Sequence, residues 1–595
     1  MNGEKKKYTF TRVMLRVIPI SFKTTPVLSI VVILMGILHA LTWAVGIIAT
    51  QNLFDAVSNA AAGYIGIGEC IMSLLILTAV TFGQQVMNGV HNFVGVGIAI
   101  PKSLRGVKTM LHRKLQRIDP SRFEETSFLD DLNKAREGIA VIPLFSQLIF
   151  LIVCFYGVYF GSIGIYLYRL KPILVITLVV AFIPALLAQI VRGKVFTKLE
   201  EQNAPLRREY EYYQKTICDR EYFKETRLLG AFDFFHKLFS DTMLLLTHKT
   251  WQAERKTALL QLLLNITSFA GMAISAYMLF TATMSGEITV GAFAAVFAAL
   301  GNIFSIMQEI INMHIGSMNR DIGKITNFVR MLDIPEWTGT EKTPDFSKGI
   351  VAQNISFTYP GRDEPAVRDV SLTIAEGETI AIVGENGAGK STLVRLLTGI
   401  YHPSDGKVTV GGLDTARFAP KSVYKGISGV FQKYQRYKMT LKDNVAISDM
   451  ESPGTERLDT ALHDADFNSE SAGPDTMLSP EFDGIDLSGG QWQRLAIARG
   501  LYRQNGFIVL DEPTSAIDPI EETKIYTQFQ HLASGKCAVV VTHRLGSAKL
   551  AHRIVVMDGG RIIDTGTHNE LVARPGKYAD MWIAQAKWYE RGSSQ

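Results

Sequence analysis

The 595-residue sequence is poor in cysteine and has no strong excess of charge of either sign. Its four cysteines lie far apart without the spacing of a metal site, so we expect free thiols and no disulfide framework. Lysine and arginine number 61 and aspartate and glutamate 56, a formal net charge of +5. This near balance argues against nucleic acid as a partner. The length predicts more than one domain.

Other absences concern the N-terminus and the chain's symmetry. No small-residue cleavage site separates the basic stretch Lys5–Lys7 from the first long apolar run, so we expect no cleavable signal peptide. No internal repeat is visible.

Charged residues are absent from six apolar runs that are each long enough to span a bilayer. The runs cover Val27–Thr50, Cys70–Ile100, Ile139–Tyr168, Ile173–Val191, Ala258–Gly286 and Ile288–Gln308. Buried core helices of a soluble protein are the alternative, but six such runs in one half of a chain argue against it. We predict an all-α, six-helix transmembrane domain over residues 1–335, within a lipid membrane.

Basic residues alternate from one connection to the next. They gather before the first run, after the second and after the fourth, whereas the other three connections are short and poor in bases. Cytoplasmic loops carry the excess of lysine and arginine, which predicts an integral membrane protein with both termini and the two long loops in the cytoplasm.

The two long loops carry apolar residues at helical spacing over Leu111–Glu137 and Glu200–Trp251. We predict helices that continue out of the membrane and break at Pro120 and Gly230, with turn-like segments at Pro120–Asp130 and Asp219–Thr226. A solvated hairpin without a partner is the alternative; we favour a docking role.

Proline and glycine mark a linker at residues 336–349, and the pattern then changes to short strands, turns and helices. We predict that residues 350–595 form an α/β P-loop ATPase domain with an added β-subdomain.

The clearest motif of this second half matches G-x-x-x-x-G-K-[ST] between an apolar strand, Thr379–Val383, and a helix. Its glycines let backbone N–H groups face an anion, its lysine reaches the β- and γ-phosphates and its serine can bind Mg²⁺. An ordinary glycine-rich turn is the alternative. We predict ATP and Mg²⁺ as ligands, with nucleotide contacts from Gly384, Asn386, Gly387, Gly389, Lys390, Ser391 and Thr392.

A second apolar strand, Phe507–Leu510, ends in the acid pair Asp511 and Glu512. An acid at such a strand end can hold Mg²⁺, so we expect Asp511 to be a metal ligand with Ser391. Glu512 is then placed to polarise an attacking water and is our candidate catalytic base.

The stretch Leu487–Gln491 (LSGGQ) opens a helix with a serine and two glycines, which makes another anion-binding helix N-terminus. With this stretch the chain resembles the ATP-binding cassette (ABC) transporters, whose signature it matches. In that family the signature contacts the ATP bound by a partner cassette, which implies this role for Ser488, Gly489, Gly490 and Gln491.

The same resemblance implies roles for four further positions. Tyr359 is similar to the aromatic that stacks on adenine, and Gln432 to the glutamine that senses Mg²⁺, here a metal ligand and ATP contact. His543 resembles the catalytic histidine near the γ-phosphate. Ser515 and Asp518 resemble the loop that crosses between cassettes, with Ile517 where leucine is usual.

The fused spans and cytoplasmic arms resemble the exporter class of half-transporters, in a bacterial cell membrane. Such a chain needs a second half-transporter; a homodimer is favoured and a heterodimer stays open. The stretches Pro120–Asp130, Arg220–Arg227 and Glu481–Trp492 look like those of bacterial lantibiotic-type peptide exporters. The resemblance therefore implies an ATP-driven exporter of an amphipathic substrate, a peptide.

Several alternatives stay open. A lipid flippase and a multidrug exporter use the same scaffold, and so does an ATP-gated channel or regulator, although an ion channel should show charged pore residues. A soluble cassette ATPase acting on DNA or ribosomes conflicts with the six runs. Polar residues inside the runs could line a path or form interhelical hydrogen bonds. They include Gln84, Gln85, Asn88, His91, Gln147, Gln189, Asn265 and Asn302.

Overall fold

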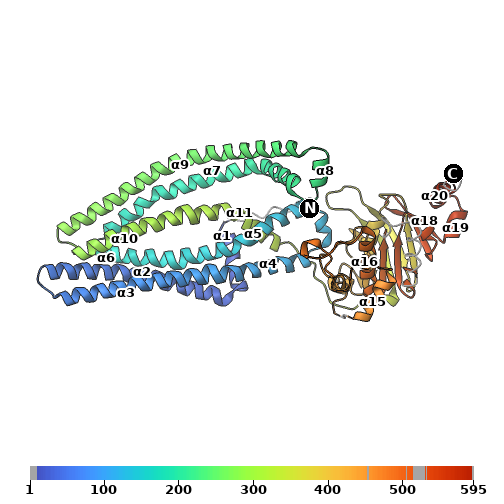
Figure 1. The fold of residues 1–595 in the computed structure, drawn as a ribbon, viewed down its shortest axis with the longest axis horizontal. Coiled ribbons are helices and arrows are strands. Elements are labelled where there is room, and N and C mark those ends of the chain that lie inside the picture. The colour runs from blue at the N-terminus through green and yellow to red at the C-terminus, as the bar shows by residue number, and fades with distance from the viewer. Residues whose placement is uncertain (1–9, 452–453, 504, 513–528, 531–532, 592–595) are drawn as a thin grey trace. The chain divides into compact units, whose positions relative to one another are not determined.

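A computed structural model describes residues 10–451, 454–503, 505–512, 529–530 and 533–591, which fold as two compact units (Figure 1). The first, the membrane unit, comprises the described residues of Met1–Arg113 and Asp131–Asp333. The second, the cassette unit, comprises those of Lys114–Asp130 and Ile334–Gln595. A short segment of the first long loop therefore packs with the cassette unit.

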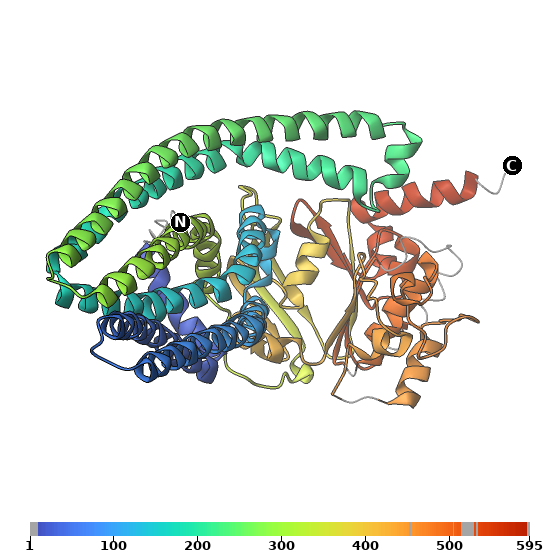
Figure 2. The same ribbon diagram turned by 60° about the vertical axis from the view of Figure 1, so that its left-hand side comes forward.

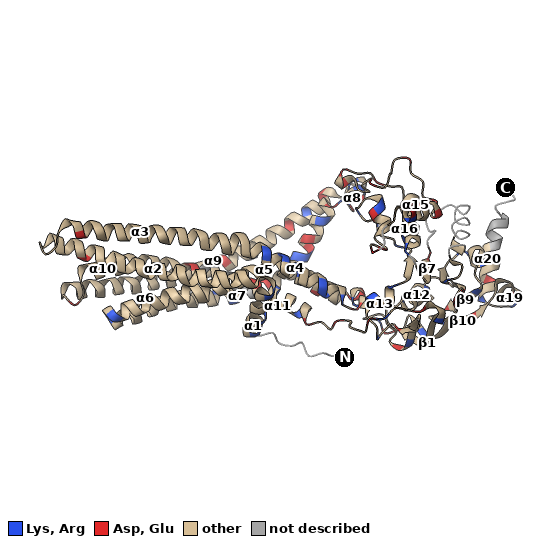
Figure 3. Cartoon of the chain, turned by 90° about the horizontal axis from the view of Figure 1, so that it is seen from below, with Lys and Arg blue, Asp and Glu red and all other residues tan. Residues whose placement is uncertain are grey.

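Within the described residues, the membrane unit has six helical stretches long and apolar enough to cross a bilayer, which confirms the predicted spans. Lysine, arginine, aspartate and glutamate are sparse along most of these helices, and they are frequent where the helices extend beyond their apolar stretches (Figure 3). The chain is thus an integral membrane protein. The stretches are Pro26–Ala61, Ile67–Gln116, Thr126–Leu170, Pro172–Glu200, Phe232–Met284 and Val290–Glu309.

Three of these helical stretches contain or lead into a π-helical segment: η1 (Phe93–Ala99), η3 (Leu151–Tyr156) and η4 (Ile310–Ile315). The α-helices around them are α1 (Phe10–Thr24), α2 (Pro26–Ala61), α3 (Ile67–Asn92), α4 (Ile100–Gln116), α5 (Thr126–Phe150), α6 (Gly157–Leu170), α7 (Pro172–Cys218), α8 (Phe223–Leu228), α9 (Phe232–Met284), α10 (Val290–Glu309) and α11 (Gly316–Leu332).

Helices α7 and α9 extend well beyond their apolar runs and lie side by side as far as α8 (Figures 1 and 2). Gly230, with φ +64°, breaks the helix between α8 and α9 in a conformation that favours glycine. In the other loop α4 ends at Gln116 and is followed by the 3₁₀ turn η2 (Pro120–Glu124). Both predicted breaks are confirmed.

The cassette unit contains two sheets among its described residues. The four-stranded sheet is antiparallel, with the order β2-β1-β4-β5, and forms the predicted β-subdomain. The larger sheet has the order β10-β9-β3-β8-β7-β6 and is parallel except for β10. The strands are β1 (Ile350–Phe357), β2 (Val367–Ile374), β3 (Thr379–Val383), β4 (Asp405–Val410), β5 (Leu413–Asp414), β6 (Ile427–Val430), β7 (Phe507–Asp511), β8 (Cys537–Val541), β9 (Arg553–Asp558) and β10 (Arg561–Gly566).

Helices flank the larger sheet, which confirms the predicted α/β architecture. Its central strands β3, β7 and β8 are buried at every residue, as expected of a covered parallel sheet. The helices and short turns are η5 (Phe346–Lys348), α12 (Lys390–Leu397), α13 (Pro420–Tyr424), α14 (Leu441–Ala446), α15 (Thr455–Asp464), η6 (Pro480–Phe482), α16 (Gly489–Tyr502), α18 (Leu545–Ala548), α19 (His568–Ala573) and α20 (Lys577–Arg591).

Strand register decides which side chains meet at the site. Ile382 of β3 pairs with Val541 of β8, and Asp511 of β7 pairs with the same Val541. The carboxyl ends of the three strands therefore lie together, and the segments that follow them emerge at one edge of the sheet.

Candidate nucleotide site

The loop between β3 and α12 is built on glycines that no other residue could replace without strain. Gly389 has φ +96°, and a Cβ there would lie 2.5 Å from the carbonyl oxygen of Ala366. A Cβ on Gly384 would lie 2.3 Å from the carbonyl oxygen of Met557. The backbone can thus pass close to its neighbours, as a loop that encircles an anion must.

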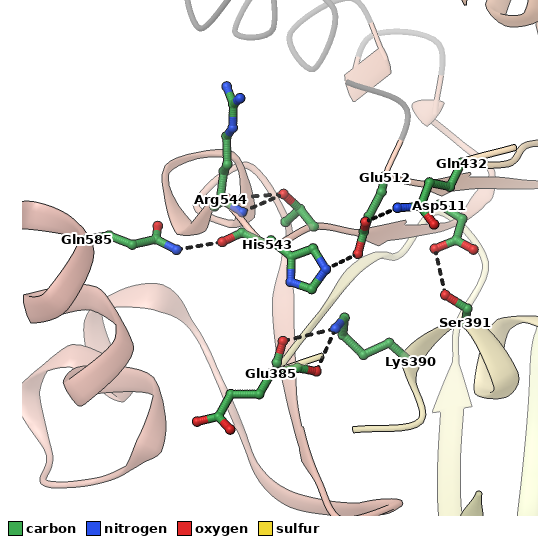
Figure 4. A network of polar contacts seen from close by, with 11 residues as sticks. Glu385, Lys390, Ser391, Gln432, Asp511, Glu512, His543, Arg544 and Gln585 are labelled. Carbon is green, nitrogen blue, oxygen red and sulfur yellow. Dashed lines mark hydrogen bonds and ion pairs between the residues drawn. The ribbon is translucent and has the colours of Figure 1, made fainter. Parts of the chain in front are cut away.

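Lys390 is buried at the start of α12, and its ammonium spans the loop. Nζ donates to the carbonyl oxygens of Gly384, at 3.0 Å, and Glu385, at 2.9 Å (Figure 4). Burial lowers the pKa of this ammonium, against the raising effect of nearby Glu512 and Asp511. A buried cation at the mouth of a helix N-terminus is suited to bind a phosphate.

Ser391 and Asp511 are brought together from different elements. The hydroxyl of Ser391, on α12, donates to Oδ1 of Asp511, at the end of β7, over 3.3 Å. Burial raises the pKa of Asp511, and the hydrogen bond from Ser391 offsets part of this rise. A hydroxyl and a carboxylate are oxygen ligands of the type that Mg²⁺ prefers, so the donor set fits the expected metal.

Glu512 lies between Gln432 and His543, as Figure 4 shows. Its Oε2 accepts from Nε2 of Gln432 at 2.8 Å, and its Oε1 contacts Nε2 of His543. Burial raises the pKa of Glu512 and lowers the pKa of His543, so burial disfavours the charged form of both groups. Glu512 also has φ +47°, a strained conformation for a non-glycine residue.

Gln585, on α20, holds the strand end that carries His543. Its Nε2 donates to the carbonyl oxygen of His543 at 2.6 Å, and its Oε1 accepts from the backbone N–H of Leu545 at 3.0 Å. Gln585 could not be predicted from the sequence because it belongs to no motif and comes from a distant helix.

Tyr359, the candidate adenine-stacking residue, is positioned through its hydroxyl. That hydroxyl lies 3.0 Å from Oγ1 of Thr392 and accepts from Nη1 of Arg395 at 3.0 Å. Arg395 also donates to the hydroxyl of Tyr401 and lies 3.6 Å from the carboxylate of Glu124, in η2. Arg395, Tyr401 and Glu124 could not be predicted from the sequence, because their contacts join segments far apart in the chain.

Ser488 begins α16 with a capping box. Its hydroxyl accepts from the N–H of Gln491 at 3.3 Å, and the Gln491 side chain accepts from the N–H of Ser488 at 3.0 Å. No heavy atom lies within 4 Å of a Cβ built on Gly489 or Gly490, so this helix start is open to a ligand or partner.

The phosphate loop and the signature stretch pack on two different hydrophobic clusters. Ala388 of the loop belongs to one cluster, and Leu487 and Trp492 belong to the other. Within the phosphate loop, Asn386 and Gly387 are exposed. Ser515, Ile517 and Asp518 lie outside the described residues.

Parts of this chain are similar to a known family and to known proteins. Residues 367–515 match the family model described as "ABC transporter". The subtilin transport ATP-binding protein SpaT of Bacillus subtilis is 32% identical over 370 residues, which are 60% of each chain. An ATP-dependent lipid A-core flippase of Escherichia coli K12 is 32% identical over 307 residues, 50% of this chain and 51% of the relative.

A solved structure extends the likeness to the whole fold. A bacterial Atm1-family ABC exporter with ATP bound superposes with a TM-score of 0.72 at 22% identity, over 95% of this chain and 98% of that one. The sequence alignments thus span half to three fifths of each chain, whereas the shared fold includes both units.

Proposed function

We propose that this chain is a transporter of the ABC type, and that it uses ATP hydrolysis to move an amphipathic peptide out of the cytoplasm. The matched family model and the fold shared with a solved ABC exporter support this proposal. The observation that carries the proposal is the convergence of Lys390, Ser391, Asp511, Glu512 and His543 at one sheet edge in a chain with six spans. A candidate nucleotide site and six candidate membrane spans are thus combined in one polypeptide.

In this proposal each residue of the site has a stated task. Lys390 and the N–H groups of the phosphate loop bind the β- and γ-phosphates of ATP. Ser391, Asp511 and Gln432 would hold Mg²⁺, which neutralises phosphate charge when bound. Glu512 orients a water and accepts its proton, and His543 keeps Glu512 in place while facing the γ-phosphate. Tyr359 stacks on adenine.

We further propose that two copies form the working unit, with both cassettes in the cytoplasm. The open helix start at Ser488–Gln491 would then contact the ATP held by the partner's phosphate loop. A homodimer is favoured because Glu512, His543 and Leu487–Gln491 are all intact, so that two identical chains would give two competent sites. ATP binding would close the pair and hydrolysis reopen it, and the helices α7 and α9 would carry this motion to the spans.

The peptide assignment has narrower support than the export direction. It rests on the resemblance of Pro120–Asp130, Arg220–Arg227 and Glu481–Trp492 to lantibiotic-type exporters, and on the relative named for subtilin transport. A lipid flippase is the second candidate, since relatives at similar identity are named for lipid A-core.

Inside-out membrane vesicles provide the test. A labelled amphipathic peptide added outside should accumulate in the lumen only with ATP and Mg²⁺, and vesicles carrying Glu512→Gln should not accumulate it. Glu364→Gln, at an exposed acid of the cassette unit, is the matched control. Movement in the opposite direction, or ionic current without turnover, would contradict the proposal. Lipid movement between leaflets without peptide accumulation would favour the flippase.

A further inference from the structure

The membrane unit contains a cavity of about 340 Å³ to which all three π-helical segments contribute. Gly95 comes from η1, Leu151 from η3 and His314 from η4. π-Helical turns are rare and occur mostly at functional sites, because the extra residue re-aims side chains and opens the helix. Three of them around one cavity indicate a binding site.

Two histidines line this cavity, and a row of rings holds both in place. The ring centroids of His91 and His39 are 5.6 Å apart, and those of His39 and Phe155 are 4.6 Å apart. Next along η3, the hydroxyl of Tyr156 lies 3.1 Å from Nε2 of His314. The indole N–H of Trp43 donates to Nε2 of His39 at 3.3 Å. Neighbouring side chains therefore hold both cavity histidines in place: His39 contacts His91, and Tyr156 contacts His314.

Other polar residues within the spans divide between two roles. Gln84 donates to the carbonyl oxygen of Thr42 at 2.8 Å and so joins α3 to α2 as an interhelical hydrogen bond. His91 and Gln147 line the cavity instead. Gln84 therefore fits the alternative of an interhelical hydrogen bond, whereas a path lined by His91 and Gln147 stays a prediction.

The lining combines an apolar wall with an acidic polar end. Val96, Val141, Leu144 and Leu148 supply apolar surface. The polar members are His91, Asn92, Gln147, His314 and Asp321, and among the described lining residues none is lysine or arginine. Glu309 lies 3.7 Å from His314 and adds a second carboxylate nearby.

Lys324, which does not line the cavity, lies near the acidic end of the cavity wall. Nζ of Lys324 is 3.9 Å from Asp321, on the next turn of α11, and its side chain remains 44% exposed. A pair at this distance and exposure is weak. A ligand ammonium could therefore replace Lys324 as the partner of Asp321.

We propose that this cavity binds the transported molecule, and that the molecule is a cationic amphipathic peptide. The inference rests on the proposed function and narrows its substrate. The apolar wall takes leucine-like side chains, Asp321 takes an ammonium or guanidinium group, and Gln147 and the histidines accept or donate hydrogen bonds. A phosphorylated lipid would instead place phosphates against a carboxylate without a lining cation, which costs free energy.

The position of the cavity suits uptake from the cytoplasm under the proposed topology. Its residues lie at the end of the second apolar run, at the start of the third and just beyond the sixth. In the topology set by the basic loops, these are the cytoplasmic ends of the three runs.

The test measures binding without nucleotide to the full chain in lipid nanodiscs. The probes are a fluorescent Leu/Lys peptide and the same peptide with glutamate in place of lysine. Asp321→Asn should weaken binding of the Leu/Lys peptide about fivefold or more and should not weaken the Leu/Glu peptide. The control is Glu69→Gln, an exposed acid at the opposite end of α3, which should change neither affinity. Equal affinity for the Leu/Lys peptide in Asp321→Asn and wild type would overturn the inference.

A second variant fills the cavity without changing its charge, and a matched glycine substitution outside the cavity is its control. A Cβ on Gly95 would meet only Oε1 of Gln147, at 3.6 Å, so Gly95→Leu projects into the cavity. It should abolish peptide binding, whereas Gly83→Leu, earlier on α3 with open space around it, should not. Binding that survives Gly95→Leu would contradict this location.

The two experiments distinguish a failure of the proposed binding cavity from a failure of the proposed export. Normal nucleotide-free binding with no ATP-driven accumulation would reject the proposed export but keep the cavity. Accumulation that is unaffected by Asp321→Asn and Gly95→Leu would reject the cavity but keep export. Tighter binding of a lipid A-type phosphoglycolipid than of the Leu/Lys peptide would also overturn the inference.

Discussion

Glu124, at the end of η2 in the loop between α4 and α5, lies 3.6 Å from Arg395, on the helix that follows the phosphate loop. The Glu124 carboxylate also accepts a hydrogen bond from the hydroxyl of Tyr401. Arg395 in turn donates to the hydroxyl of Tyr359 at 3.0 Å. All four residues belong to the cassette unit, so a loop segment that starts between two spans is joined by polar contacts to the aromatic proposed to stack on adenine.

We predict that Glu124→Ala weakens ATP binding about two- to fivefold. Without its carboxylate, Arg395 and Tyr401 lose the group that fixes them, and Tyr359 becomes less well positioned for stacking. The measurement is equilibrium binding of a fluorescent ATP analogue to the purified chain. Glu125→Ala is a close control, because Glu125 pairs with Arg122, at 3.0 Å.

A double-mutant cycle separates this network from a general loss of stability. In a Tyr359→Phe background, which lacks the hydroxyl bound by Arg395, Glu124→Ala should cost less affinity than in wild type. Fully additive losses would show that Glu124 does not act through Arg395 and Tyr359.

For Glu512→Gln we predict retained ATP binding and a loss of turnover of about a hundredfold or more, since a positioned general base contributes about that much. Glutamine keeps the shape and the contact to Gln432 but cannot accept the proton of water. Steady-state ATPase activity and ATP affinity should be measured together. An ATPase rate close to wild type would remove Glu512 from its proposed role.

Lys390→Met should act on binding itself. Methionine preserves much of the buried apolar stem but removes the ammonium proposed to bind phosphate, so ATP affinity should fall about tenfold or more. The same binding assay and a thermal unfolding scan check this result together. An unchanged ATP affinity with a normal melting temperature would count against Lys390 as a phosphate ligand.

Gln585→Leu should lower kcat with little change in ATP affinity. Leucine is similar in size but removes both hydrogen bonds that fix the backbone around His543, so the imidazole is less often in contact with Glu512. Restoration of kcat by Gln585→Glu is not expected, because glutamate cannot donate to the carbonyl oxygen of His543. A fall in ATP affinity without a change in kcat would contradict this positioning role.

Local sequence signals predicted much of the fold because they depend on neighbouring residues only. The absence of charge in six runs predicted the spans. The β-branched run before the glycine loop predicted β3, and the stretch that follows the loop predicted α12. The same is true of the breaks at Pro120 and Gly230.

Features that depend on packing between distant segments could not be predicted in this way. The π-helical segments carry no sequence signal of their own, and the positive φ of Glu512 follows from how its strand end is held. Arg395 and Gln585 belong to no motif, and only the fold brings them to Tyr359 and His543. The sequence therefore predicted individual members of the polar network around the candidate nucleotide site, such as Tyr359 and His543. It did not predict the residues that hold them in place.

The last prediction concerns the sharing of sites between two chains. If each ATP lies between the phosphate loop of one chain and the signature of the other, a mixed dimer of a Lys390→Met chain and a Gly490→Asp chain keeps one intact site. Both defects fall in the same site, and the other combines an intact loop with an intact signature. Such a dimer should retain part of the wild-type ATPase activity, whereas either mutant homodimer should have very little.

The reciprocal mixture is the control. A wild-type chain paired with a chain that carries both substitutions has one defect in each shared site, so it should be inactive. If each chain instead used its own signature, the outcomes would reverse: the first mixture would be inactive and the second would keep one site. Differently tagged chains, purified in tandem and assayed for ATPase activity, distinguish the two arrangements, because the two mixtures contain the same substitutions in the same number.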